Sequence, residues 1–173
     1  MTMHFIFPYA SKPVSITQNM CDHNGHMNVL FYSQIFGESM DDFYAGTLGF
    51  SGEYFDSGFS SFSLEDNIKY VKECLLDEII VTRYRLHRVN KKLIHLTAVM
   101  LNEEDQLCAI YETILGHIDM KSRKTAPMAG PFFDNLYQIM EEHNQREINI
   151  PLRLQIKEIL SKYIQCIYSF AHC

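Results

Sequence analysis

The feature that most constrains the fold is a polar turn that runs directly into a long apolar segment. The turn spans Asp22 to Asn28 (DHNGHMN), and the apolar segment continues from Val29 to Ala45. Gly25 can adopt a positive φ and so lets the backbone reverse, and Asn28 is a residue type that caps helices. We therefore predict a helix over residues 29–45. It should be buried on several sides, because apolar residues occupy most of its circumference, and Gly37 within it predicts close packing.

The start of this helix is a candidate reaction site. A helix N-terminus presents unpaired N–H groups and a positive dipole end, which together stabilise anions and developing oxyanions. The amides of Asn28 and Val29 are therefore candidate oxyanion donors. Asp22 could attack an acyl carbon or deprotonate water, or it could simply cap the turn. His26 could orient Asp22 or bind a carbonyl, or it could tie the turn to the backbone.

A two-residue period in the sequence predicts a β-sheet. Strands are expected at residues 12–20, 60–70, 78–89, 93–101 and 107–120. Short turns at 90–92 and 102–106 favour an antiparallel meander. Residues 4–7 could add a short edge strand, and the glycines between 46 and 58 predict a long loop. The fold class is therefore α+β, with an antiparallel sheet wrapped around a long central helix.

The segment after residue 126 differs from the rest of the chain. Pro127 and Pro131 interrupt the strand pattern, and two helices are expected at 132–144 and 151–170. We therefore divide the chain into a domain at 1–126 and a C-terminal helical extension at 127–173 that packs on the same domain. Covering the outer face of the sheet is its expected role, and a lid, an oligomer interface or a partner-binding arm are alternatives.

Composition excludes several classes of protein. The 173-residue chain is 47% hydrophobic and 21% charged, which is typical of a globular domain, and its net charge of −6 argues against nucleic acid as a partner. Five cysteines without a C-x-x-C motif do not predict a disulfide framework. No signal peptide or membrane span is evident, so a cytoplasmic protein without a membrane partner is expected. The spacing of Cys21, His23 and His26 matches no usual zinc site, and no metal is predicted.

The turn and the helix resemble the hotdog-fold acyl-CoA thioesterases, in the group that includes 4-hydroxybenzoyl-CoA thioesterase. The pattern in that group is an Asp, then Gly-His-(Val/Met)-Asn, then a Tyr in the helix. Here Asp22, Gly25 to Asn28, and Tyr32 match it. Within the group, the sequence looks most like the betainyl-CoA thioesterases of carnitine breakdown, through Phe36 to Glu38 and Phe62 to Glu65. The resemblance covers roughly residues 12–126.

This resemblance implies a hydrolase that cleaves an acyl-CoA to a free acid and coenzyme A, with Asp22 as nucleophile or base. It implies homodimers that join their sheets, with the sites at the interface, and sometimes tetramers. Coenzyme A enters as part of the substrate, and no cofactor is expected. Asn24, Gly25 and Tyr32 are candidate substrate-binding residues, and Glu65 could reach the site from a partner subunit. Candidates for holding the coenzyme A phosphates are Arg83, Arg85, Arg88, Lys91, Lys92, Lys121, Arg123 and Lys124.

Two other functions are compatible with a hotdog fold. A hotdog enoyl-CoA hydratase resembles D-x-N-P-x-H, but here the histidine follows Asp22 by four residues and Gly25 replaces the proline. A non-catalytic acyl-binding module is the other alternative. A serine hydrolase is not expected, because G-x-S-x-G is missing. The acyl group stays open; a trimethylammonium group would need an aromatic cage, for which the candidates are Tyr32, Tyr44, Tyr54 and Phe55.

Overall fold

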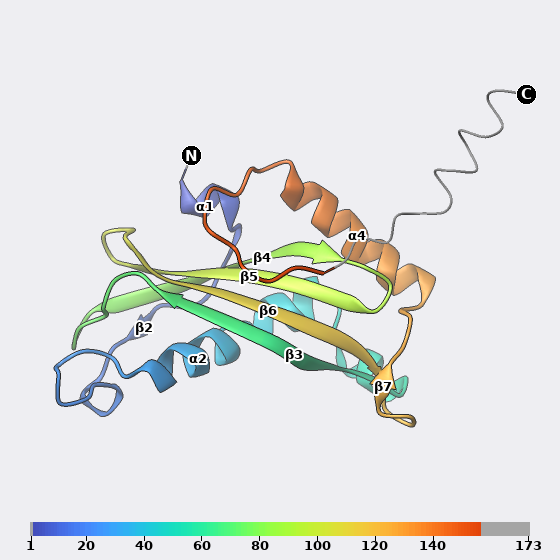
Figure 1. Ribbon diagram of the computed structural model, residues 1–173, viewed down its shortest axis with the longest axis horizontal. Helices are drawn as coiled ribbons and strands as arrows, with labels where there is room; N and C mark the ends of the chain where they lie inside the picture. Colours follow the sequence, from blue (N-terminus) through green and yellow to red (C-terminus); the bar gives the residue numbers. More distant parts are fainter. Residues whose placement is uncertain (1, 157–173) are drawn as a thin grey trace, which may run out of the picture.

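The computed structural model describes residues 2–156, which build one antiparallel sheet around a helix (Figure 1). Five of its strands follow the order β1-β4-β5-β6-β3, while β2 pairs with β4 and β7 pairs with β6. This arrangement confirms the predicted α+β fold. The strands are β1 (Tyr9–Ala10), β2 (Val14–Ser15), β3 (Phe59–Tyr70), β4 (Ile79–Val89), β5 (Leu93–Asn102), β6 (Leu107–Asp119) and β7 (Lys124–Thr125).

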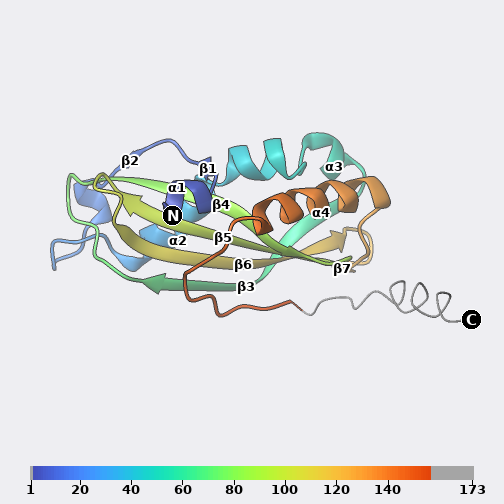
Figure 2. The ribbon, with the colours of Figure 1, turned by 90° about the horizontal axis from the view of Figure 1, so that it is seen from above.

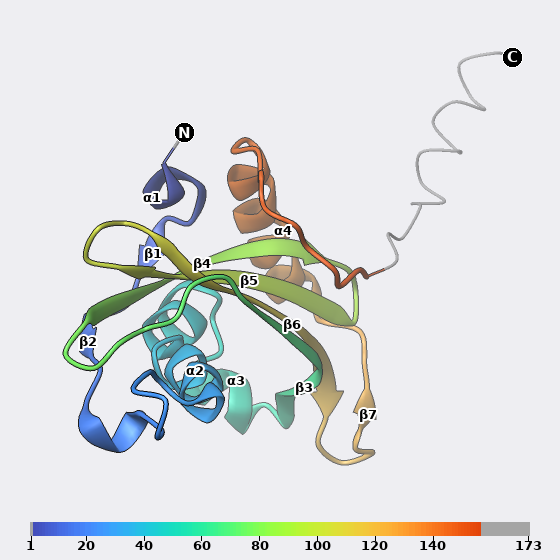
Figure 3. The same cartoon turned by 60° about the vertical axis from the view of Figure 1, so that its left-hand side comes forward.

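The helices lie on both sides of this sheet. On one side are α2 (Val29–Glu38), the π-helix η2 (Asp42–Thr47) and α3 (Gly52–Asp56), and on the other are α1 (Met3–Ile6) and α4 (Gly130–Asn144) (Figures 1 and 3). We call the sheet face toward α2 the inner face and the opposite one the outer face. A short 3-10 helix, η1 (Gln18–Met20), precedes the polar turn.

The predicted long strands are present, but their order differs from a simple meander. The strands β4, β5 and β6 are consecutive neighbours, as expected. By contrast, β3 pairs with β6 and forms one edge of the sheet. Residues 71–78 therefore pass β6 and β5 before the chain enters β4. The predicted strand at 60–70 is therefore correct in extent but has a different neighbour. Sequence periodicity carries no signal for which strands pair, because pairing depends on contacts far along the chain.

The central helix is shorter than predicted. The α-helix ends at Glu38, and the chain continues through a turn into the π-helix η2, in which Leu48 donates its N–H to Phe43 O over 3.0 Å. The expectation that Gly37 allows close packing is wrong, because an added Cβ would meet no atom within 4 Å. Glycine instead weakens the helix near the point where it ends. The π-turn adds a residue to the turn while keeping Phe43 buried.

The segments around this helix also depart from the predictions. The strand expected at 12–20 is reduced to β2, because the chain turns into η1 where Thr17 and Asn19 hydrogen-bond each other. The short edge strand considered at residues 4–7 is the helix α1, and β1 follows it. Part of the loop expected at 46–58 is the helix α3, which Ser51 caps.

Two apolar clusters hold the layers together. The larger one fills the space between the inner face and α2 and extends to Leu136 and Met140 of α4. Phe36, Tyr84 and Leu96 are among its other buried members. The smaller one lies on the outer face, where Ile6 and Phe7 of the N-terminal segment cover Val99 and Leu101, with Ile148 and Ile150 packed against them. Both terminal segments of the described chain therefore cover the outer face.

We call residues 145–156 the C-terminal strap. It leaves the end of α4 and crosses β5 and β6 toward the β3 edge (Figure 2). The strap is fastened at Glu112 of β6, a fully buried carboxylate that accepts the N–H groups of Arg153 (2.9 Å) and Leu154 (3.0 Å). Glu112 also accepts a hydrogen bond from Asn67 of β3 and lies 3.3 Å from His95 Nε2. Desolvation of this carboxylate is thus compensated by donors from two other segments.

The C-terminal extension is only partly described. Its first predicted helix corresponds to α4, which packs along β4, where the His143 ring contacts the backbone of Leu86. The second predicted helix, at 151–170, falls mostly outside the described residues, and residues 151–156 are not helical. The division of the chain at residue 126 stays a prediction. Within residues 2–156, none of the helices combines the length and the apolar character needed to span a bilayer.

Candidate active site

The polar turn is closed by hydrogen bonds of its own backbone. The N–H of Asp22 donates to His26 O (3.1 Å), and the N–H of Gly25 donates to Asp22 O (3.0 Å). Gly25 has φ of +82°, so the predicted need for a positive φ is confirmed. The Asp22 Oδ1 accepts the N–H of Asn24 (2.9 Å). This bond fixes the direction of the carboxylate and leaves its other oxygen without a partner among the described residues.

The helix start behind the turn has one free amide. Asn28 caps α2 as predicted, because its Oδ1 accepts the N–H of Leu30 (3.0 Å). Its own N–H is not available to a ligand, since it donates to Met20 O (2.8 Å). Of the two amides that the sequence suggested as oxyanion donors, the one on Val29 therefore remains: within the described residues its N–H makes no hydrogen bond, and the residue is exposed.

His26 is held beside the helix start rather than against Asp22. Its Nδ1 lies 3.3 Å from Met27 O, which is the backbone tie considered from the sequence. With Nδ1 protonated, Nε2 is an acceptor that can take a proton from water or from a thiol. The backbone of His26 pairs with Leu75, and Met27 donates its N–H to Cys74 O (2.8 Å). The connection between β3 and β4 thus supports the turn.

Tyr32 lies in the core and does not reach a ligand at the turn. Its side chain is 4% exposed, and burial raises the pKa of its hydroxyl above the usual value. The ring packs edge-on against Tyr70 at the end of β3, with 5.0 Å between centroids. Tyr32 therefore joins α2 to β3, while the half-exposed Tyr70 presents a ring to solvent beside the turn.

Of the two adjacent acids on β3, Asp66 is the one on the inner face. Side chains alternate between faces, and Asp66 accepts a hydrogen bond from the Tyr111 hydroxyl (3.0 Å), whose ring stacks on Phe36 of α2. Burial raises the pKa of Tyr111 to about 12. Glu65 points to the outer face and is exposed, so it does not share a face with the helix. The sequence suggested Glu65 and not Asp66, because alternation puts the two acids on opposite faces but does not say which face lies toward the helix.

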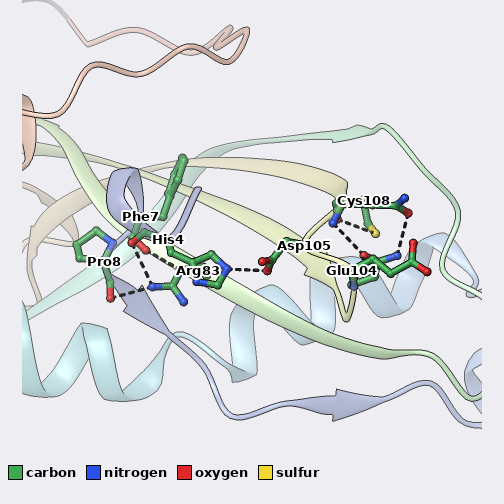
Figure 4. A network of polar contacts seen from close by, with 9 residues as sticks. His4, Phe7, Pro8, Arg83, Glu104, Asp105 and Cys108 are labelled. Atoms are coloured by element: carbon green, nitrogen blue, oxygen red, sulfur yellow. Dashed lines mark hydrogen bonds and ion pairs between the residues drawn. The ribbon is translucent and has the colours of Figure 1, made fainter. Parts of the chain in front are cut away.

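Two of the arginines suggested for coenzyme A have structural roles instead. Arg83 donates to the carbonyl oxygens of His4, Phe7 and Pro8 and so holds the N-terminal segment (Figure 4). Arg85 is 1% exposed and donates to the carbonyl oxygens of Ile6, His143 and Arg146, and burial lowers its pKa to about 10. The buried Arg85 guanidinium is therefore not free to bind a phosphate, so that part of the prediction is wrong, while Arg83 is mainly occupied by the N-terminal segment.

The remaining basic residues gather at the other end of the sheet from Asp22. Lys91 and Lys92 lie in the turn between β4 and β5, Lys121 and Arg123 lie in the turn between β6 and β7, and Lys124 begins β7. Figure 1 shows both turns at the right, with the Asp22 turn at the left. Lys91 lies over the Phe133 ring and Arg123 over the Phe62 ring. Within one subunit, then, the carboxylate and the basic cluster are separated.

Exposed apolar side chains surround the Asp22 turn. We call them the turn-side patch, and their exposed fractions run from 38% for Leu76 to 74% for Leu30. Two hollows, of about 340 and 320 Å³, lie elsewhere, against β1 and the N-terminal segment. Among residues 2–156, no cluster of His, Cys, Asp or Glu is arranged to hold a metal ion. The patch consists of Val29, Leu30, Tyr70, Val71, Leu75 and Leu76.

Comparison with known sequences identifies one family. Residues 16–136 match the family described as the thioesterase-like superfamily. The L-carnitine dehydrogenase/betainyl-CoA thioesterase of Agrobacterium fabrum is 26% identical over 122 residues, which cover 70% of this chain and 25% of that protein. The betainyl-CoA thioesterase of Pseudomonas aeruginosa is 27% identical over 132 residues, 75% of this chain and 81% of that protein. The chain thus spans about a quarter of the length of the first of these relatives.

Solved structures support the same fold. A hypothetical protein of Staphylococcus aureus in complex with CoA superposes with a TM-score of 0.69 at 18% identity, covering 87% of this chain and 94% of that one. A DHNA-CoA thioesterase of the same organism gives 0.68 at 18% identity, with 84% and 99% coverage. These similarities confirm the predicted hotdog fold.

Proposed function

Because the chain belongs to the thioesterase-like superfamily, we propose that it hydrolyses the thioester of an acyl-CoA to a free acid and coenzyme A. One observation carries the proposal: the Asp22 carboxylate and the unpaired Val29 N–H flank the same helix start. In this proposal Asp22 acts on the thioester carbonyl, and the Val29 N–H stabilises the oxyanion that forms there. No cofactor takes part, and coenzyme A enters with the substrate.

Two routes use these groups. In the first, an Asp22 oxygen attacks the thioester carbon, the C–S bond breaks, and water then hydrolyses the mixed anhydride. In the second, Asp22 takes a proton from water, the hydroxide adds to the carbon, and the proton passes to the leaving thiolate. The bond from Asn24 N–H to Oδ1 keeps the carboxylate aligned in either route, and His26 Nε2 is a second acceptor for a proton at the turn.

The active unit in this proposal is a homodimer formed through β3. This strand is a sheet edge of 12 residues with unpaired backbone groups, and Tyr70 and Val71 at its end are half exposed. Antiparallel pairing of two β3 strands would bury the turn-side patch. It would also bring the basic end of the partner next to Asp22, since the pairing reverses the direction of the second sheet. A carboxylate and a phosphate-binding cluster, separated in one subunit, would then share a site.

The outer face is a poor surface for assembly into a tetramer. The N-terminal segment and the C-terminal strap occupy it, and Ile6, Phe7 and Leu154 are buried beneath or within this layer. A tetramer would therefore need another surface, and the dimer is the proposed assembly.

The relatives named betainyl-CoA thioesterases make a betainyl group the first acyl candidate. The aromatic cage considered from the sequence is mostly committed to packing, because Tyr32 is buried, Tyr44 bonds Ser61, and Tyr54 donates to Ser60 O. Phe55 and Tyr70 keep exposed rings. A cationic acyl group would have to be recognised by these two rings or by residues of both subunits.

The test is hydrolysis of a panel of acyl-CoA thioesters, with thiol release followed by a thiol-reactive dye. The panel contains betainyl, short, long and aromatic acyl groups. Asp22→Asn keeps an oxygen that can accept the Asn24 N–H and removes the negative charge. We expect it to lower kcat by about 10²- to 10⁴-fold, with unchanged dimerisation.

The matched control is Asp56→Asn, which changes an exposed acid at the end of α3. If the wild type hydrolyses none of these thioesters, or if Asp22→Asn is as fast as Asp56→Asn, the proposal is wrong. Hydration of an enoyl-CoA and simple acyl binding, measured on the same protein, would then be the next functions to examine.

A further inference from the structure

The inner-face side chains of β3 form a line that runs away from the Asp22 turn. Side chains on one face of a strand are two residues apart, so this line contains Tyr70, Ile68 and Asp66. Tyr70 lies nearest the turn, because its ring contacts Tyr32 in the first helical turn of α2, with 5.0 Å between centroids. We call this line the α2–β3 seam. Along it, an aromatic and an aliphatic side chain are followed by one acid.

The Asp66 carboxylate has no cationic partner in the described part of the subunit. One of its oxygens accepts the Tyr111 hydroxyl (3.0 Å), and within residues 2–156 no Lys, Arg or His forms an ion pair with it. The Tyr111 ring is itself stacked on Phe36 of α2. The hydroxyl therefore holds the carboxylate at a defined place on the inner face. Because Asp66 is exposed, its second oxygen is open to a ligand.

The acid lies some distance from the proposed reaction point. Val29 and Phe36 share a face of α2, and the seven residues between them rise about 10 Å. The Phe36 ring marks the level of Tyr111 and hence of Asp66. A thioester carbonyl bound at the Val29 N–H would therefore have the carboxylate about 10 Å further along the seam.

This spacing can be compared with the reach of an acyl chain. An extended chain advances about 1.2 Å per bond, and an ion pair spans up to about 4 Å. A cation four to six bonds beyond the carbonyl carbon therefore matches the spacing. A cation only two bonds beyond it, as in a betainyl group, falls short of Asp66.

We propose that Asp66 selects acyl groups that carry an ammonium or trimethylammonium group four to six bonds beyond the thioester carbonyl. The cation would pair with the open carboxylate oxygen. A neutral chain of the same shape would leave the carboxylate without a counter-ion once a partner subunit covers the β3 edge, which is unfavourable. The inference rests on the proposed thioesterase function and names the substrate class of the same site.

The experiment measures the hydrolysis of matched pairs of acyl-CoA thioesters by the full-length protein. In each pair one acyl group ends in trimethylammonium and the other in the uncharged tert-butyl group of the same shape. The pairs place this group two, four or six bonds beyond the carbonyl carbon. At four or six bonds we expect kcat/KM to be at least tenfold higher for the charged member, whereas at two bonds the pair should agree within about twofold.

Variants test whether Asp66 is the source of this preference. Asp66→Asn keeps an oxygen that can accept the Tyr111 hydroxyl and removes the charge, so it should abolish the preference for the charged member. Glu65→Gln is the matched control, because it neutralises the adjacent acid on the outer face, and it should retain the preference.

A binding measurement separates this inference from the proposed function. Its ligands are the same pairs with a methylene group inserted between the sulfur and the carbonyl, so that they contain no thioester to hydrolyse. Calorimetry should give a lower Kd for the charged member with the wild type and equal Kd values with Asp66→Asn. If no thioester is hydrolysed but this binding pattern is found, the proposed function fails and the inference stands.

Three results would overturn the inference. The first is equal kcat/KM and equal Kd for the charged and neutral members at every length, or no measurable binding of either. The second is a preference that persists in Asp66→Asn, which would assign the recognition to another residue. The third is a preference that is largest at two bonds, which would place the cation away from Asp66. If Asp66→Asn does not fold, Asp66→Lys replaces it and should favour an acyl group that ends in a carboxylate; an unchanged preference for trimethylammonium in that variant also overturns the inference.

Discussion

The buried carboxylate of Glu112 should hold the C-terminal strap in place, and Glu112→Gln should release it. In the structure this carboxylate accepts the N–H groups of Arg153 and Leu154 and a hydrogen bond from Asn67. A glutamine keeps a single acceptor oxygen, and its NH₂ group would face at least one of the two strap N–H donors. The change therefore replaces charge-assisted hydrogen bonds with a donor facing a donor.

The size of the effect follows from these contacts. A hydrogen bond to a charged group contributes about 1.5–3 kcal/mol, and a buried unsatisfied donor costs about 1–3 kcal/mol. Because the neutral glutamine side chain is less costly to bury than a carboxylate, it offsets part of the energy lost with these hydrogen bonds. The free energy that holds the strap on the sheet should therefore fall by about 3 kcal/mol, and the population with a detached strap should rise roughly 100-fold.

Limited trypsin digestion measures this population, because Arg153 is an exposed cleavage site inside the strap. Cleavage after Arg153 should be roughly 100-fold faster in Glu112→Gln than in the wild type. If detachment couples to global unfolding, Tm should fall by about 6–12 °C. The control is Glu104→Gln, an exposed acid in the turn before β6. Equal cleavage rates at Arg153 in the two variants would refute the assignment of Glu112 as the anchor.

Two further predictions concern protonation and the choice between adjacent acids. Burial lowers the pKa of His143 to about 4, whereas a histidine in an unfolded chain has a pKa of about 6.5. The neutral His143 therefore makes its full contribution to the free energy of unfolding above about pH 6.5, and this contribution is lost as the pH falls toward 4. The free energy of unfolding, measured with urea at several pH values, should show this loss of at most about 3 kcal/mol in the wild type but not in His143→Gln. If the wild type and the variant lose stability in parallel as the pH falls, the prediction is contradicted. If β3 borders the active site of a dimer, Asp66→Asn should lower kcat/KM at least tenfold, by analogy with the loss of a positioned polar group. Glu65→Gln, on the opposite face, should leave kcat/KM within twofold, and equal losses in both variants would refute the assignment of faces.

Local sequence signals correctly predicted the elements that depend on short-range interactions. Gly25 adopts the positive φ that its turn requires, and Asn28 caps the helix that begins at Val29. Alternation predicted β3 to β6 to within one residue at each end, because the two-residue period is a direct consequence of strand geometry. The resemblance of the turn to the thioesterase pattern identified the family, since that pattern combines turn chemistry with a helix start.

The tertiary structure decided what depends on distant parts of the chain. Whether the Asn28 N–H is free depends on Met20 O, and whether Arg85 can bind a phosphate depends on carbonyl oxygens of α1 and α4. Which face of β3 lies toward α2, and so whether Asp66 or Glu65 is on the inner side, depends on the pairing of β3 with β6. The contact of Glu112 with the strap likewise joins segments more than thirty residues apart. Local propensity contains no term for such contacts, because they form only when the whole sheet has closed around its helix.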